Sequence, residues 1–163
     1  IALAILYVAL ARRIGWTAHA LNTPGHVLVT VGEGEPVVID PFDRGALLDP
    51  QRLATMLQTL LGGAALRDEH IAPMSNRAVL LRLLMNQASR AERSGALGRT
   101  LALFERIMTI APAYSNGWWE LARLQLATGD SGAARESLTS LLETTRDPLA
   151  RAQANAALDA LTA

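Results

Sequence analysis

The sequence predicts an α+β protein in which one helix and a short antiparallel sheet precede an all-α part. Three observations support this fold class. The chain opens with an unbroken apolar run at residues 1–11, two β-rich runs follow at residues 26–31 and 36–40, and only helical patterns occur after about residue 73. Because periodicity is the main signal of secondary structure, we expect the two parts to fold differently.

The first part begins with a helix and continues with strands. Residues 1–14 predict a buried helix that Gly15 ends, because glycine is common just past a helix C-terminus. Residues 16–21 predict a short strand. The glycine-rich residues 32–35 separate the two β-rich runs, and this pattern predicts a hairpin whose strands pair antiparallel.

A second helix and a linker complete this part. Asp49 is a common N-cap residue, and Pro50 fits the first helical turn because its missing N–H has no partner there in any case. The helix is expected to stop at Gly62-Gly63. Residues 67–74 predict a linker.

The remainder of the chain repeats with a period of 34 residues. Five pairs of residues of like character have this separation: Leu84 and Trp118, Ala88 and Ala122, Gly95 and Gly129, Phe104 and Leu138, Ile107 and Leu141. This is the period of the tetratricopeptide repeat, a helix-turn-helix unit. We therefore divide the chain into a first domain, residues 1–73, and about two and a half helical repeats, residues 74–163, of which residues 148–161 form a capping helix.

The second repeat carries the stronger signature. Gly129 marks its turn, and Ala134 is the small residue where its two helices approach closely. In the first repeat Thr100 stands in place of that alanine. The register predicts that Trp118 belongs to the core and that Trp119 is exposed.

The composition narrows the classes of function. Fifteen basic residues balance fifteen acidic ones, whereas nucleic-acid-binding domains are usually basic. The chain has no Cys, which excludes a thiolate nucleophile within these residues. The opening apolar run is shorter than the roughly 20 residues that span a bilayer. We expect a cytoplasmic protein that binds neither nucleic acid nor membrane and holds no metal or other cofactor.

Two polar residues of the predicted hairpin could carry chemistry. His26 opens one β-rich run and Asp40 closes the next, so antiparallel pairing brings them to the same end of the hairpin. An imidazole beside a carboxylate is the base and orienting group of a nucleophilic triad. The pair can equally be structural, with Asp40 accepting a hydrogen bond from His26 that pins the hairpin.

The order of helix, His strand and Asp strand resembles the transglutaminase-like branch of the papain-like superfamily. Ala11-Arg12-Arg13-Ile14-Gly15 is similar to the end of that family's buried helix, Pro24-Gly25-His26 to its His element, and Ile39-Asp40-Pro41-Phe42 to its Asp element. Together with the repeats, these motifs resemble the bacterial SirB-type proteins over nearly the whole chain. The resemblance implies a partial papain-like core with His26 as base and Asp40 as orienting group.

The resemblance also implies where a nucleophile would lie. Counted back from Gly15, the family's Cys position falls one residue before Ile1, so we expect the chain to be truncated at its N-terminus. The first three residues offer no hydroxyl or thiol in its place. Many SirB-type relatives have Pro instead of that Cys. A core without its nucleophile cannot run covalent acyl chemistry, although general-base catalysis on water stays open.

Charge is distributed unevenly along the chain. Five arginines and one acid lie between residues 77 and 99, and five acids and one arginine lie between residues 33 and 49. These segments could be solvated faces, or they could dock on each other. Alternatively, the repeat face binds an acidic peptide or protein segment. The residues predicted to bind this partner are Arg82, Arg90, Arg93 and Trp119.

Three functions are compatible with these features. The first is a protein-interaction module, built from tetratricopeptide repeats on a catalytically degenerate transglutaminase-like core, which would make the protein a pseudoenzyme. The second is a Cys-His-Asp acyl transferase or hydrolase whose nucleophile lies just before residue 1. The third is a structural or regulatory subunit without chemistry of its own. We expect the first.

Overall fold

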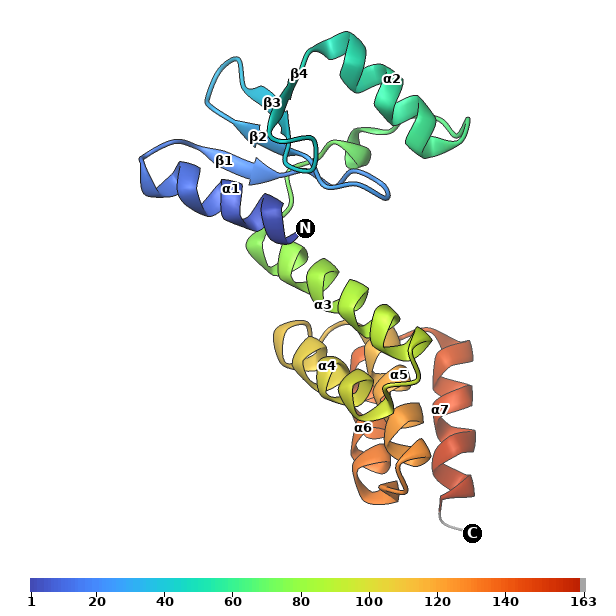
Figure 1. Cartoon of the computed structure of the whole chain (residues 1–163). Coiled ribbons are helices and arrows are strands. Elements are labelled where there is room, and N and C mark those ends of the chain that lie inside the picture. Colours follow the sequence, from blue (N-terminus) through green and yellow to red (C-terminus); the bar gives the residue numbers. More distant parts are fainter. Residues whose placement is uncertain (162–163) are drawn as a thin grey trace. The chain divides into compact units, whose positions relative to one another are not determined.

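The computed structural model describes residues 1–161. The chain divides into two compact units, Ile1–Leu80 and Leu81–Ala163. Figure 1 shows a small sheet with helices in the first unit and helices alone in the second. The predicted α+β fold class is therefore confirmed. The division follows Leu80 instead of residue 73, and it falls inside one continuous helix, α3 (Asn76–Arg93).

The first unit contains a four-stranded antiparallel sheet and two α-helices. Its elements are α1 (Ala2–Arg13), β1 (Ala18–Ala20), β2 (Val29–Val31), β3 (Val37–Asp40), β4 (Ala46–Leu48), α2 (Pro50–Leu61) and the short 3-10 helix η1 (Asp68–His70). The strands lie in the order β1-β2-β3-β4. Val29 of β2 pairs antiparallel with Ile39 of β3, so the predicted hairpin is confirmed.

Helix α1 covers one face of the sheet. Ala4, Val8 and Ala11 recur at helical spacing and are buried, in one cluster with Val29 and Val31 of β2. Alanine at two of the three positions lets the helix backbone lie close to the strands. The prediction of a buried helix is therefore right for this face only, because Leu3, Leu6 and Leu10 on the rest of α1 are exposed.

Helix α2 packs on the other face. Leu28 and Val38, which alternate with the residues that face α1, contact Leu53 of α2 in a separate cluster. The predicted N-cap is present: the Asp49 carboxylate accepts a hydrogen bond from the Arg52 N–H at 2.8 Å. The sheet is therefore covered by a helix on each side.

The first β-rich run is a strand only in its second half. His26 lies in the loop before β2, where its N–H donates to the carbonyl of Pro24 at 2.7 Å. Gly25, with a φ of +66°, permits this tight turn. The prediction that residues 26–31 are all strand is wrong for the first three, because the turn holds their backbone out of the ladder with β3.

Two short elements were not predicted. Strand β4 has only three residues and no β-branched side chain, so its sequence carries little strand propensity. Pairing of Ala46 with Asp40 in β3 forms it instead. Helix η1 lies within the segment that was predicted to be a linker.

The turn between β3 and β4 leaves no room for a side chain at Gly45. Its φ is +78°, and an added Cβ would collide with the hydroxyl oxygen of Tyr7 and lie 3.2 Å from Cζ of that ring. The Gly45 N–H donates to the carbonyl of Asp40 at 3.0 Å. The phenol of α1 therefore packs directly against the turn that follows Asp40.

The second unit contains the repeat helices. After α3 come α4 (Leu97–Ile110), α5 (Ser115–Ala127), α6 (Ser131–Thr144) and α7 (Pro148–Ala160). Both bounds of α4 recur in α6 after 34 residues, Leu97 as Ser131 and Ile110 as Thr144. The predicted period is therefore confirmed. None of the helices within residues 1–161 combines the length and the apolar character needed to cross a lipid bilayer.

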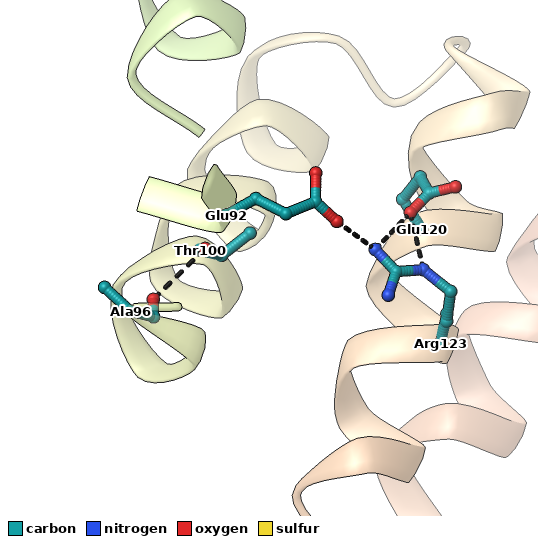
Figure 2. Close-up of polar contacts among 5 residues, drawn as sticks. All are labelled: Glu92, Ala96, Thr100, Glu120 and Arg123. Carbon is teal, nitrogen blue, oxygen red and sulfur yellow. Dashed lines mark hydrogen bonds and ion pairs between the residues drawn. The ribbon is translucent and has the colours of Figure 1, made fainter. Parts of the chain in front are cut away.

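Small or internally bonded residues stand where the helices of each repeat approach. Ala134 is fully buried in one cluster with Ala122, as the register predicts. Thr100 holds the equivalent place and is also buried. Its hydroxyl donates to the Ala96 carbonyl of its own helix at 3.1 Å (Figure 2). Because this bond satisfies the buried polar atom, Thr can replace Ala at the contact.

We predict that Gly45→Ala lowers the free energy of unfolding by more than Gly34→Ala does. Both glycines have a positive φ, +78° and +72°, so each alanine strains the backbone by about 1–2 kcal/mol. Only at Gly45 does the new Cβ meet another side chain, which adds about 1–3 kcal/mol of overpacking. Chemical denaturation of the two variants measures the difference.

Tyr7→Phe provides the test of cause, because it removes the hydroxyl that the new Cβ would meet first. The double variant with Gly45→Ala should regain part of the lost stability. Equal losses at Gly45 and Gly34, or no recovery in the double variant, would contradict this packing.

Candidate functional site

The loop before β2 and the end of β3 bring His26 and Asp40 together. Nε2 of His26 lies 2.8 Å from Oδ1 of Asp40, within hydrogen-bond distance. The structure therefore places the two predicted catalytic residues side by side at one end of the hairpin. Their catalytic roles stay predictions.

The Asp40 carboxylate is buried and well supplied with donors. The residue is 4% exposed, and its Oδ1 also accepts hydrogen bonds from the backbone N–H groups of Phe42 at 2.8 Å and Asp43 at 3.3 Å. Burial by itself raises the pKa of the Asp40 carboxyl, but the hydrogen bonds from His26 and Phe42 outweigh it. The pKa therefore lies below its ordinary value of 3.8. Asp40 is an oriented anion at neutral pH.

The imidazole of His26 is held at one nitrogen and open at the other. Nε2 is engaged by Asp40, and Nδ1 makes no hydrogen bond within the described part of the chain. The ring centroid lies 5.2 Å from that of Phe42, with the two planes tilted by 56°. The side chain is 26% exposed. Nδ1 is thus the nitrogen that could exchange a proton with solvent or a reacting group.

This arrangement has the geometry that the base and the orienting group of an acyl-transfer site would need. Asp40 favours the tautomer with the proton on Nε2, which leaves the lone pair of Nδ1 as the base. The residues of this chain include no Cys that could act as the attacking nucleophile. Over residues 1–161, no three His, Cys, Asp or Glu side chains gather closely enough to hold a metal ion.

Comparison with known proteins agrees with this geometry. Residues 1–85 match the family model of the transglutaminase-like superfamily, and residues 91–161 match that of the tetratricopeptide repeat. The chain belongs to the transglutaminase-like superfamily and continues with tetratricopeptide helices, as the resemblance of its motifs implied.

Two curated bacterial relatives cover most of the chain. A UPF0162 protein from Xylella fastidiosa strain 9a5c is 29% identical over 148 residues, and one from strain Temecula1 is 28% identical over the same length. Each alignment covers 88% of this chain and 53% of the relative, so the chain spans about half the length of these relatives. No solved structure gives a significant match.

The four residues predicted to bind a partner lie on α3 and α5. Arg90 and Arg93 are exposed near the end of α3, whereas Arg82 is half-buried, and loss of solvent around it lowers its pKa. Trp119 is also half-buried, because it packs on a cluster formed by α5, α6 and α7. The prediction that Trp119 is exposed is therefore wrong in this respect.

Trp119 lines a small surface cavity of about 130 Å³. Its walls come from α5, α6 and α7: Trp119, Ala122, Arg123, Leu126, Leu138 and Ala157. Arg123 is the single charged residue among them. Sequence reasoning missed this cavity because no local pattern connects three helices that only tertiary packing brings together.

Arg123 also joins the two helices that carry the predicted partner residues. Its Nη2 donates to Oε1 of Glu92 at 2.7 Å, and its Nε donates to Oε2 of Glu120 at 2.8 Å (Figure 2). The bond to Glu120, followed by that to Glu92, raises the pKa of the Arg123 guanidinium. The sequence showed Glu92 as a lone acid among arginines, whereas the structure adds Glu120 beside it.

We predict that Asp40→Asn destabilises the protein at neutral pH and that the difference shrinks in acid. Because the folded state lowers the pKa of Asp40, the carboxylate stabilises the fold above the ordinary value of 3.8, and this contribution is lost as the pH falls through the folded-state pKa. We expect a loss of about 1–3 kcal/mol near neutral pH. Urea denaturation over a range of pH measures it.

Asp43→Asn is the matched control, since Asp43 is an exposed carboxylate of the same turn. Its substitution should change stability much less. A loss that is the same in acid as at neutral pH, or an equal loss from Asp43→Asn, would show that the Asp40 charge has no such role.

Proposed function

We propose that this chain is a protein-interaction module, in which tetratricopeptide helices bind a partner and the transglutaminase-like core is catalytically degenerate. The presence of both domain types supports the proposal, because repeat helices build extended binding surfaces. The same combination of core and repeats is that of the SirB-type proteins that the sequence resembles.

The observation that carries the proposal is the surface formed by Arg90 and Arg93 of α3 with Trp119 and Arg123 of α5, called here the α3–α5 surface. Arg90 and Arg93 are exposed, lie three residues apart on one side of the helix, and make no ion pair among the described residues. The Glu92–Arg123 bond joins α3 to α5, and Arg123 also lines the Trp119 cavity. Exposed cations and an apolar cavity thus lie on two helices that the Glu92–Arg123 ion pair joins.

This surface fits a partner segment with acidic residues and one small apolar side chain. Carboxylates of the partner would pair with Arg90 and Arg93. Arg123 is already paired with Glu92 and Glu120. It therefore forms part of the cavity wall, and its positive charge is not free to bind a carboxylate of the partner. The cavity volume of about 130 Å³ suits a single small side chain.

We predict that a fluorescein-labelled, Glu-rich peptide with one central Leu binds the chain, and that Arg90→Ala with Arg93→Ala weakens this binding. Each exposed ion pair contributes about 0.2–1 kcal/mol, so the double variant should bind about twofold to thirtyfold more weakly. Added salt should weaken wild-type binding further, because it screens exposed charges. Fluorescence anisotropy measures all three quantities.

Arg52→Ala with Arg106→Ala is the matched control, because both side chains are exposed and lie outside the α3–α5 surface. Their loss changes the net charge by the same amount. An equal loss of affinity in this control would show that the peptide responds to the net charge of the protein and not to Arg90 and Arg93. If the wild-type protein does not bind the peptide at low salt, the proposal of an acidic partner is wrong.

The second candidate is a Cys-His-Asp acyl transferase or hydrolase, and the geometry of His26 favours it. Asp40 engages Nε2, so Nδ1 stays available to accept a proton from a nucleophile. The resemblance puts that nucleophile at the position directly before Ile1. Ile1 itself is half-buried against the cluster that contains Val27, the residue after His26.

We predict that a chain extended by one Cys before Ile1 reacts with iodoacetamide about tenfold faster than its His26→Ala variant near neutral pH, if this candidate is correct. An adjacent imidazole and a helix N-terminus both favour the thiolate. Ala113→Cys, at an exposed loop position, is the control thiol. Equal rates with and without His26 would leave the interaction module as the sole proposal.

A further inference from the structure

A second, larger cavity lies in the first unit, away from the His26–Asp40 pair. It has a volume of about 250 Å³ and opens between α1, β1 and the first turns of α3. Aliphatic and thioether side chains make up most of its wall, among them Ile5, Val8, Met74 and Val79. Its polar lining consists of Arg12 and Asn76. None of the functions considered above uses this cavity.

The guanidinium of Arg12 is held in place at this cavity by contacts with three residues. Nε donates to the carbonyl of Ala18 at 2.9 Å, Nη1 donates to Oδ1 of Asn76 at 2.9 Å, and Nη2 lies 3.3 Å from Nδ1 of His19. A guanidinium has five N–H donors, so two are left over. No carboxylate within residues 1–161 forms an ion pair with Arg12. Its charge is therefore oriented but not neutralised.

We propose that this cavity binds a small aliphatic carboxylate. The hydrocarbon tail of the ligand would lie among Ile5, Val8 and Val79, and its carboxylate would bind Arg12. Burial of the hydrocarbon tail removes apolar surface from water, which favours binding. The remaining N–H donors of Arg12 supply charge-assisted hydrogen bonds at the exposed end. The volume lies just below the range of about 300–1,000 Å³ of drug-sized ligand sites, which matches a short acyl chain.

The lining favours a ligand with one polar group over a peptide segment. Each peptide unit brings an N–H and a carbonyl that need partners when they are buried. The wall offers only Arg12 and Asn76 for this purpose, and Asn76 already binds Arg12 through its Oδ1. A monocarboxylic acid needs a single anion site, and Arg12 provides one. This inference is independent of the interaction module.

Octanoate is the probe, and titration into the whole chain by NMR or calorimetry is the experiment. We expect saturable binding of one octanoate per chain. Acetate has the carboxylate without the hydrocarbon tail, and octanol has the tail without the carboxylate. Each of them should bind at least about tenfold more weakly than octanoate.

Variants at the mouth of the cavity test the assignment of Arg12. Arg12→Gln should weaken octanoate binding at least tenfold, whereas Arg13→Gln, at the adjacent exposed arginine, should leave it unchanged. Because Arg12 also joins Ala18 and Asn76, its loss could unfold the first unit. Ala9→Leu avoids this difficulty, since Ala9 is exposed and lines the cavity. It should also weaken binding at least tenfold, with Ala2→Leu as its control.

Four results would overturn the proposal. The first is the absence of saturable octanoate binding by wild type up to about 10 mM. The second is binding that neither Arg12→Gln nor Ala9→Leu changes. The third is equal affinity for octanol and octanoate, which would mean that Arg12 contributes nothing. The fourth is binding of a peptide that ends in leucine when octanoate does not bind. This result would mean that the ligand is a peptide and not an aliphatic carboxylate.

Discussion

Antiparallel pairing of β2 with β3 positions the residues of the first unit that could carry chemistry. The ladder from Val29–Ile39 to Val31–Val37 places the loop before β2 beside the end of β3. His26 and Asp40 meet there at 2.8 Å. Helices cover both faces of the sheet, so the pair is supported from the core and not by the hairpin alone. Backbone donors of the following turn complete the surroundings of Asp40.

The repeat unit depends on a different constraint, the close approach of paired helices every 34 residues. Ala134 meets it by its small size, and Thr100 meets it by turning its hydroxyl onto its own helix. The exposed ion pairs of Arg123 contribute little to stability by comparison, as is general for surface salt bridges. Their effect is geometric, because they fix the guanidinium at the wall of the Trp119 cavity.

The two units therefore differ in what they bring to function. In the transglutaminase-like unit, His26 and Asp40 have the geometry that acyl chemistry would require of a base and an orienting group. The repeat unit exposes Arg90 and Arg93 on α3 and has an apolar cavity between α5, α6 and α7. Arg12, part of the motif that resembles the family, donates hydrogen bonds to Ala18 and Asn76.

The sequence by itself determined the features that local physical chemistry controls. Asp49 and the glycines after α2 bound that helix because caps and left-handed turns depend on neighbouring residues, and the 34-residue period showed the repeats. Only the tertiary structure decided the rest. Strand β4 exists because β3 offers it a ladder, and Trp119 is half-buried because α6 and α7 pack over it. Glu92 and Arg123 stand 31 residues apart. Local propensity cannot link residues at such distances, because their contact depends on how whole helices pack.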